Sequence, residues 1–304
     1  MSASGKANGT DQRTRFLLEE AGVRGVRVRL GQAWREIRGR TDYPPAVAEL
    51  LGEASAAAAL LTAHAKVDGR LSLQLRGEGA LRLLFAECTA DDTLRGIAQF
   101  DEQAGPRDFS RDLRRLGAGA MLAITIENHP PSAREPQRYQ GLVPLESDSL
   151  AGALEDYFRR SEQLPTRLLL AADGRRAAGL MLQKLPGDAG DADGFTRAGA
   201  LLDTLAPGEL LDWPDQTLLH RLYHEERVRL LDRRALRFAC SCSRQRVAAV
   251  LQSIGREEAL AAAESGVAEV RCEFCGQRYH FDADAIAGLF APPGDGLEAP
   301  ERLQ

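Results

Sequence analysis

The sequence predicts an α+β protein, with an N-terminal domain built on an antiparallel-rich sheet with flanking helices, a helical linker, and a small C-terminal cysteine domain. Strand-like runs follow one another across short turns, with helical runs before and after them, which favours an antiparallel α+β sheet. The composition shifts to small and acidic residues near position 186, as at a domain boundary. Four of the five cysteines lie between Cys240 and Cys275.

The N-terminal domain is expected over residues 11–185, after a flexible leader at residues 1–10. Residues 23–30 alternate apolar and basic side chains, the period of a strand with one buried face. Residues 43–66 are rich in Ala and Leu after two prolines, which indicates a helix with a broad apolar face. The other elements expected here are strands at 71–75, 80–86, 93–100, 120–127, 138–145, 168–172 and 178–182, and a helix at 149–160.

This domain offers no recognisable catalytic set, so we expect the protein not to be an enzyme. Cys88 follows a strand and is expected to be a small apolar filler. His64 and His129 have no nucleophile or acid partner nearby in the sequence.

Residues 186–238 are expected to form a largely helical linker. Its short amphipathic pieces are interrupted by Pro207 and Pro214, and a dense run of charges follows at residues 224–229. The linker is either an ordinary surface segment with a solvated charged face, or a metastable cover that docks on the sheet. The residues expected to dock are Leu218, Leu219, Leu222 and Tyr223.

The four clustered cysteines form two close pairs, Cys240 with Cys242 and Cys272 with Cys275, separated by about thirty residues. Two such pairs can bring four sulfurs to one tetrahedral ion. Structural disulfides are less favoured because residues 1–15 lack the apolar core of an export signal. A thioredoxin-like pair should open a helix, whereas the second pair lies in a predicted hairpin. The sequence therefore predicts one zinc ion per chain, held by all four cysteines.

The zinc domain is expected over residues 239–290, followed by a flexible tail at residues 291–304. Three histidines could also bind a metal, but four cysteines already complete a tetrahedron. We therefore expect His220, His224 and His280 to be surface or hydrogen-bonding residues. The apolar complement of this domain is thin, so the metal should supply much of its stability.

The overall charge and hydropathy restrict the partners and the location. The formal net charge is −5, which argues against a nucleic-acid binder. No apolar run is expected to approach the length of a membrane span, so we expect no membrane partner. Together with the missing export signal, this predicts a cytoplasmic protein.

The cysteine spacing and several other stretches resemble the redox-regulated heat-shock chaperones, the 33-kDa chaperonins. The resemblance covers roughly residues 11–288. Besides the Cys-x-Cys and Cys-x-x-Cys pairs, the stretches that carry it are LLTA at 60–63, QLRGEG at 74–79, YQGLVPLE at 139–146 and YFRRSEQLPT at 157–166.

This resemblance implies a holdase that prevents aggregation of thermally unfolding and oxidatively damaged client proteins. It implies an inactive reduced form with zinc bound. Oxidation is expected to form disulfides Cys240–Cys242 and Cys272–Cys275, release zinc and unfold the linker. Of the two interpretations of the linker given above, the resemblance therefore favours a metastable cover over an ordinary surface segment. The resemblance also implies independence of ATP and a homodimer when oxidised.

Two other classes of function remain open on the cysteine pattern alone. A zinc-knuckle protein that binds nucleic acid or the ribosome would use arginines near the site to contact phosphate. An oxidoreductase would use one cysteine pair as a dithiol. Neither class accounts for the matching stretches outside the cysteines.

Overall fold

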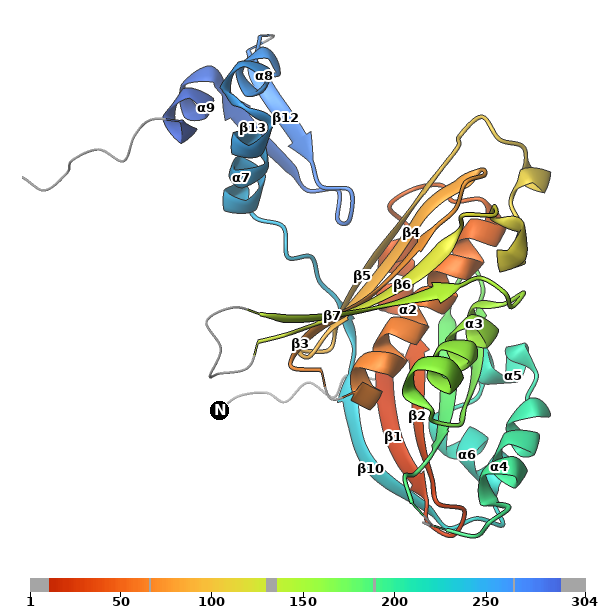
Figure 1. Ribbon diagram of the computed structural model, residues 1–304. Coiled ribbons are helices and arrows are strands. Elements are labelled where there is room, and N and C mark those ends of the chain that lie inside the picture. Colours follow the sequence, from red (N-terminus) through yellow and green to blue (C-terminus); the bar gives the residue numbers. More distant parts are fainter. Residues whose placement is uncertain (1–10, 66, 130–135, 188–189, 265, 291–304) are drawn as a thin grey trace, which may run out of the picture. The chain divides into compact units, whose positions relative to one another are not determined.

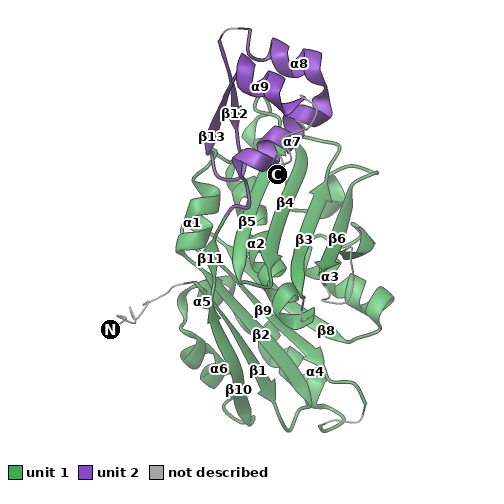
Figure 2. Cartoon of the chain, turned by 90° about the vertical axis from the view of Figure 1, so that its left-hand side faces the viewer, with its two compact units in different colours: residues 1–239 green, residues 240–304 purple. Residues whose placement is uncertain are grey.

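The chain forms two compact units, Met1–Ala239 and Cys240–Gln304 (Figure 2), each described by itself below. In this computed structural model the described residues are 11–65, 67–129, 136–187, 190–264 and 266–290. The predicted leader and tail lie outside them. Residues 186–238, predicted as a linker, are part of the first unit.

The first unit contains a five-stranded antiparallel sheet in the order β10-β1-β2-β9-β8 (Figure 1). The inner strands β2 and β9 are buried along most of their length, although β2 carries three arginines. The strands are β1 (Gln12–Leu18), β2 (Val23–Leu30), β8 (Thr166–Ala172), β9 (Ala177–Lys184) and β10 (Val228–Ala235).

A second sheet in this unit has six strands in the order β11-β5-β4-β3-β6-β7. Its pairings are antiparallel except for the parallel pairing of β11 with β5. The strands are β3 (Gly69–Arg76), β4 (Leu81–Thr89), β5 (Thr93–Phe100), β6 (Met121–Asn128), β7 (Gln137–Pro144) and β11 (Arg237–Phe238).

Helix α2 (Pro45–Ala65) packs against both sheets and is buried along almost its whole length (Figure 1). By length and composition it could cross a membrane, so the expectation that no apolar run approaches that length is wrong. Its most apolar window is 89% buried in the fold, which makes α2 a core helix. Small residues dominate it, and this lets the strands of both sheets approach closely.

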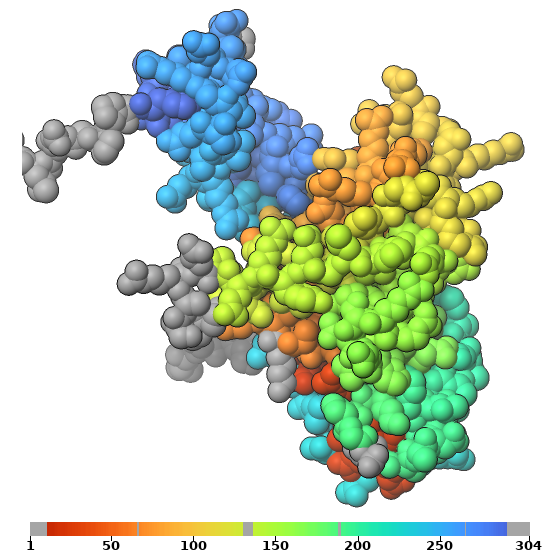
Figure 3. Space-filling model, in the orientation of Figure 1, coloured from red at the N-terminus to blue at the C-terminus, as the bar shows by residue number. Residues whose placement is uncertain are grey.

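The other face of the five-stranded sheet is covered by three helices, α4 (Gly194–Asp203), α5 (Pro207–Asp212) and α6 (Asp215–Tyr223). Figure 3 shows the teal segment around residue 200 lying directly against the rest of the first unit. The last part of the linker is not helical, because β10 adds to the edge of one sheet and β11 to the other.

Shorter helices complete the first unit. Helix α1 (Gln32–Arg38) follows β2, and α3 (Leu150–Tyr157) packs against β7 and β8. A π-helical turn, η3 (Phe158–Glu162), continues α3. Two 3₁₀ turns, η1 (Pro106–Asp108) and η2 (Leu113–Arg115), lie between β5 and β6.

The second unit contains a hairpin, β12 (Val267–Arg271) with β13 (Arg278–Asp282), and three helices. Its described core has only seven buried apolar side chains, far fewer than the core around α2. The helices are α7 (Arg244–Ile254), α8 (Arg256–Ala261) and α9 (Ala283–Leu289).

The α+β class with antiparallel sheets is confirmed, but two details of the prediction are wrong. The N-terminal strands form two sheets rather than one, with α2 packed between them. The strand at residues 23–30 is buried on both faces, because α2 covers one face and the linker helices cover the other.

Candidate metal centre

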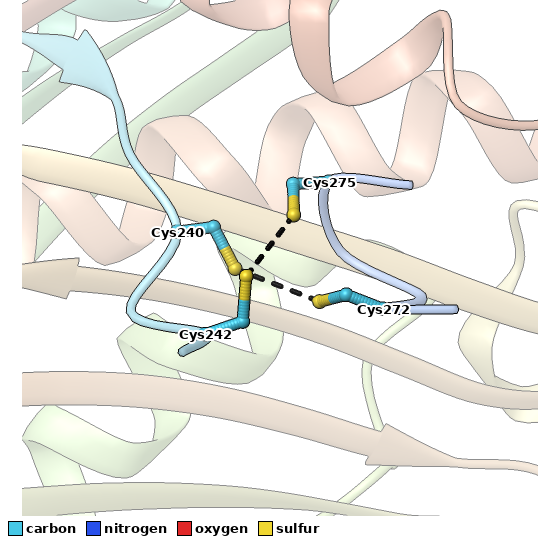
Figure 4. A group of neighbouring side chains, drawn as sticks. All are labelled: Cys240, Cys242, Cys272 and Cys275. Carbon is cyan, nitrogen blue, oxygen red and sulfur yellow. Dashed lines mark hydrogen bonds between the residues drawn. The ribbon is translucent and has the colours of Figure 1, made fainter. Parts of the chain in front are cut away.

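Four cysteine sulfurs from two distant stretches of the second unit meet at one point (Figure 4). Cys240 and Cys242 lie in the segment that leads into α7, and Cys272 and Cys275 lie in the turn between β12 and β13. One candidate ligand atom from each residue lies within 4.8 Å of all the others. The structure thus brings together all four predicted ligands.

The sulfur separations fit a tetrahedral metal site. The Sγ atoms of Cys240 and Cys272 are 3.7 Å apart, and those of Cys242 and Cys275 are 3.3 Å apart. A metal–sulfur bond of about 2.3 Å in a tetrahedron gives sulfur–sulfur edges of about 3.8 Å. All four cysteines are free thiols in this structure, so their sulfurs are available as ligands.

The second cysteine pair is shaped by the hairpin turn. The amide of Gly276 donates to the carbonyl of Cys272 at 2.7 Å, and the amide of Cys272 donates to the carbonyl of Gln277 at 2.9 Å. Gly276 has a φ of +72°, in the left-handed region that glycine adopts without strain. This turn points both sulfurs of the pair to the same side.

The first cysteine pair is positioned by the start of α7. The Ser243 hydroxyl accepts a hydrogen bond from the amide of Arg246 at 3.2 Å and so caps the helix. The Arg246 guanidinium donates to both the carbonyl and the hydroxyl of Ser241, which stands between the two cysteines. These bonds fix the short loop that carries the pair.

The thiols of the cluster differ in acidity. Burial raises the pKa of Cys242, but hydrogen bonds from Tyr279 and the neighbouring thiols outweigh it and lower the value to about 7. The Tyr279 hydroxyl donates to the Cys242 sulfur at 3.1 Å. Burial raises the pKa of Cys275 to about 12. A metal cation would favour the thiolate form of all four.

The three histidines considered as alternative ligands lie outside the sulfur cluster. His280 pairs with Glu269, with 3.0 Å between the Nε2 and carboxylate oxygen atoms. His220 and His224 lie at the end of α6 in the first unit, with ring centroids 6.4 Å apart. Among the described residues, the candidate metal cluster contains the four cysteines alone.

Cys88 is the fifth cysteine and lies in β4 of the first unit. It is 1% exposed, and burial raises its pKa to about 12. A buried thiol of this acidity is nearly all protonated at neutral pH and reacts slowly with oxidants.

The four predicted docking residues lie on α6 and are buried in a cluster with residues of the five-stranded sheet. Leu218, Leu219, Leu222 and Tyr223 are 0–6% exposed. The ring of Phe16 in β1 lies 6.3 Å, centroid to centroid, from the ring of Tyr223. The cluster also contains Leu18, Leu180 and Leu182 from the sheet.

An ion pair between the sheet and the linker could not be predicted from the sequence. Arg27 on β2 is fully buried and lies 3.4 Å from Asp215 at the start of α6. Burial lowers the pKa of Arg27 to about 10, although Asp215 acts in the opposite direction. The alternating pattern suggested a solvated basic face, and only the position of α6 reveals that this face is covered. An Asp directly after Pro214 at a helix start was the one available signal.

Comparisons with known proteins agree with one another over most of the chain. The family model described as Hsp33 protein matches residues 11–282. The 33 kDa chaperonin of Ectopseudomonas mendocina is 47% identical over 95% of this chain and 98% of its own length. The 33 kDa chaperonin of Azotobacter vinelandii is 46% identical over 95% and 97%.

A solved structure also has a similar fold. The crystal structure of the 33 kDa chaperonin from Thermotoga maritima aligns with a TM-score of 0.77 at 22% identity, covering 92% of this chain and 97% of that one.

Proposed function

The chain belongs to the Hsp33 family of heat-shock chaperones, and on that premise we propose that it is a redox-regulated holdase. In this proposal it binds unfolding and oxidatively damaged client proteins and prevents their aggregation, without catalysing a reaction. The reduced, metal-bound form is inactive and the oxidised form is active. The convergence of four sulfurs in a unit with a small core is the observation that carries the proposal.

We propose zinc as the metal, one ion per chain, held by Cys240, Cys242, Cys272 and Cys275. Four cysteine ligands at tetrahedral spacing are typical of structural zinc sites. Zinc has no redox chemistry of its own; when bound, it stabilises the fold and keeps the four sulfurs as thiolates. Chelation of the metal should therefore destabilise residues 239–290, which we propose to be the switch domain.

The switch step is the oxidation of two thiol pairs. A thiolate attacks one molecule of peroxide and becomes a sulfenic acid, with the loss of water or hydroxide. The second thiolate of the pair attacks this sulfur, which forms the disulfide and releases a second water or hydroxide. Two disulfides thus transfer four electrons to two molecules of peroxide and leave no thiolate ligand for the metal.

We propose that the disulfides join Cys240 with Cys242 and Cys272 with Cys275. The sulfurs lie close enough in the cluster for pairing within or between the two stretches. Once a metal no longer holds the stretches together, a partner one or two residues away remains at high effective concentration, whereas one about thirty residues away does not. Pairing within each stretch is therefore favoured.

Loss of the metal should next release the linker. The described core of the second unit has seven buried apolar side chains, so this unit should unfold when the metal leaves. Residues 186–238 immediately precede the switch domain and would lose that anchor. The apolar surface that α6 covers would then be free to bind clients, and we propose that the active form dimerises and works in the cytoplasm.

Metal and thiol analysis tests this proposal. Native mass spectrometry of the reduced protein should show one zinc per chain, and peroxide should remove it while the free thiols fall from five to one. Cys88→Ser is the matched control and should retain zinc, whereas Cys272→Ser should lose it. Retention of zinc after full oxidation, or disulfides between the two stretches, would contradict the proposed switch.

A further inference from the structure

The buried Arg27 makes its polar contacts with the linker. Its guanidinium lies 3.4 Å from the Asp215 carboxylate and donates to the carbonyls of Leu210, at 3.2 Å, and Trp213. These three residues belong to α5, to α6 and to the segment between them. If the linker leaves the sheet, the described structure offers this cation no other partner.

Asp215 is in turn held by donors from the sheet. The Thr14 hydroxyl donates to its carboxylate at 2.5 Å, and the Gln12 side-chain amide donates at 2.9 Å. Both residues lie on β1, beside Arg27 on β2. Asp215 is 3% exposed, and the nearby cations are Arg27 and, at 4.0 Å on β10, Arg233. The sheet therefore presents a set of donors shaped around one carboxylate.

Apolar side chains surround this set of donors. Phe16 and Leu18 from β1, and Leu180 and Leu182 from β9, belong to the same buried cluster as the linker leucines. The covered surface is thus mostly apolar with one fully buried cation, Arg27, while Arg176, which pairs with α5, is partly exposed. It matches a segment that carries one buried acidic side chain beside leucines, which is the pattern of residues 213–223.

A guanidinium that loses its anion within an apolar surface is strongly disfavoured unless water or another anion replaces it. A client segment with apolar residues alone would cover the surface but leave Arg27 desolvated and unpaired. A client segment with an added lysine would place a like charge beside it. A client segment that combines apolar residues with an acidic side chain covers the apolar surface and also replaces Asp215.

We propose that the surface vacated by α5 and α6 selects client segments in which an Asp or Glu stands among apolar residues, with Arg27, Thr14 and Gln12 as its carboxylate site. This inference rests on the proposed release of the linker. It adds the chemistry by which clients are distinguished, because the client takes the place of the linker helix that carries Asp215.

Peptide binding to the oxidised full-length protein tests this selection. The probes are three fluorescein-labelled peptides with leucines at helical spacing that differ at one central position, which is Asp, Asn or Lys. Fluorescence anisotropy should show the Asp peptide binding about tenfold more tightly than the Asn peptide, as expected for one charge-assisted contact, and the Lys peptide most weakly. The reduced, zinc-loaded protein should bind all three weakly, because Asp215 occupies the site.

Two variants locate the preference. Arg27→Gln should reduce the Asp-over-Asn preference to less than about twofold while apolar binding persists. Arg24→Gln makes the same charge change on the same strand but on the face toward α2, and should leave the preference near tenfold. Equal loss in both variants would indicate a general charge effect and overturn the proposed site.

If Arg27→Gln does not fold, peptide binding by the unmutated protein still tests the proposed selection. Equal affinity of the oxidised protein for the Asp and Asn peptides contradicts the selection but leaves the holdase intact. Failure to bind any peptide contradicts the proposed function itself and the selection with it.

Discussion

At the scale of single residues, the four cysteines of the cluster differ from Cys88 in their surroundings. The four are partly exposed and lie next to other thiols, whereas Cys88 is buried among apolar side chains of the first unit. Thiolate formation requires solvation or a nearby cation, and burial in an apolar core provides neither. Oxidation should therefore be confined to the cluster.

His64 at the end of α2 is a second residue whose surroundings determine its charge. It is 9% exposed, and its Nε2 atom lies 2.9 Å from the Arg24 guanidinium, so the neutral ring accepts a hydrogen bond there. Burial is the largest cause and, together with the charges of Arg24 and Arg15, lowers the pKa of His64 to about 3. Protonation would place a positive charge directly against Arg24.

This arrangement predicts a pH-dependent loss of stability that His64→Gln removes. The unfolded chain binds a proton at His64 below about pH 6.5, whereas the folded chain does so only near pH 3. The stabilisation is therefore complete above about pH 6.5 and is lost as the pH falls toward 3.

Between about pH 7.5 and pH 5, the free energy of unfolding of the unmutated protein should fall by about 2 kcal/mol more than that of His64→Gln. Urea unfolding of both proteins measures the difference, and Gln keeps an acceptor for Arg24. Parallel pH profiles of the two proteins would show that the folded protein protonates His64 normally.

The four cysteines of the candidate metal centre could be predicted to lie together because their signal is local. The two cysteine pairs are recognisable by spacing, and Gly276 marks the tight turn after the second pair. Arg27 and Asp215 could not be paired in this way, because they are far apart in the sequence and each alone resembles an ordinary surface charge. Tyr279, which donates to Cys242, has no sequence signal of its own.

At the scale of elements, the linker consists of parts with different attachments. Helix α6 is held by its apolar face and by the Arg27–Asp215 pair, both buried. Strand β10 is held by its pairing with β1 at the edge of the sheet, and most of its side chains are exposed. A buried ion pair contributes little net stability, so the leucines of α6 should supply most of the docking free energy.

Leu222→Asp should therefore weaken the docking of α6 and raise client binding while the protein is reduced and zinc-loaded. Leu222 is 6% exposed, and burial of a leucine contributes roughly 1.5–3 kcal/mol, which is about a 10- to 100-fold change in the docking equilibrium. Suppression of light scattering from a chemically unfolded enzyme measures the effect, with zinc content determined in parallel.

Leu231→Asp is the matched control for this variant. Leu231 lies on β10 and is 43% exposed, so the same substitution should leave client binding in the reduced state unchanged. A folded, reduced and zinc-loaded Leu222→Asp protein that binds clients no better than the control would show that the linker is a passive tether.

The elements of the first unit were largely predictable, and the failures have physical causes. The strand at residues 93–100 has the predicted bounds, and α2 lies within the predicted range 43–66, where a long Ala- and Leu-rich run after two prolines is a local signal. Strand β10 was missed because it lies at a sheet edge and lacks regular apolar alternation. The existence of two sheets depends on contacts between distant residues, which no local pattern encodes.

At the scale of the whole molecule, the two units differ in the size of their apolar cores. The core around α2 contains many buried side chains from both sheets, whereas the described core of the second unit contains seven. A unit of this size usually requires a metal or disulfides to remain folded. Because of this difference, we expect oxidation to unfold the second unit while the core around α2 persists.

The most direct test of the account compares one preparation in two redox states. Reduced, zinc-loaded protein and the same protein after peroxide treatment are each added to a chemically unfolded enzyme, and aggregation is followed by light scattering. The account predicts no suppression by the reduced protein and strong suppression by the oxidised protein, with Cys88→Ser behaving as the unmutated chain does. Equal activity in the two states would contradict redox regulation.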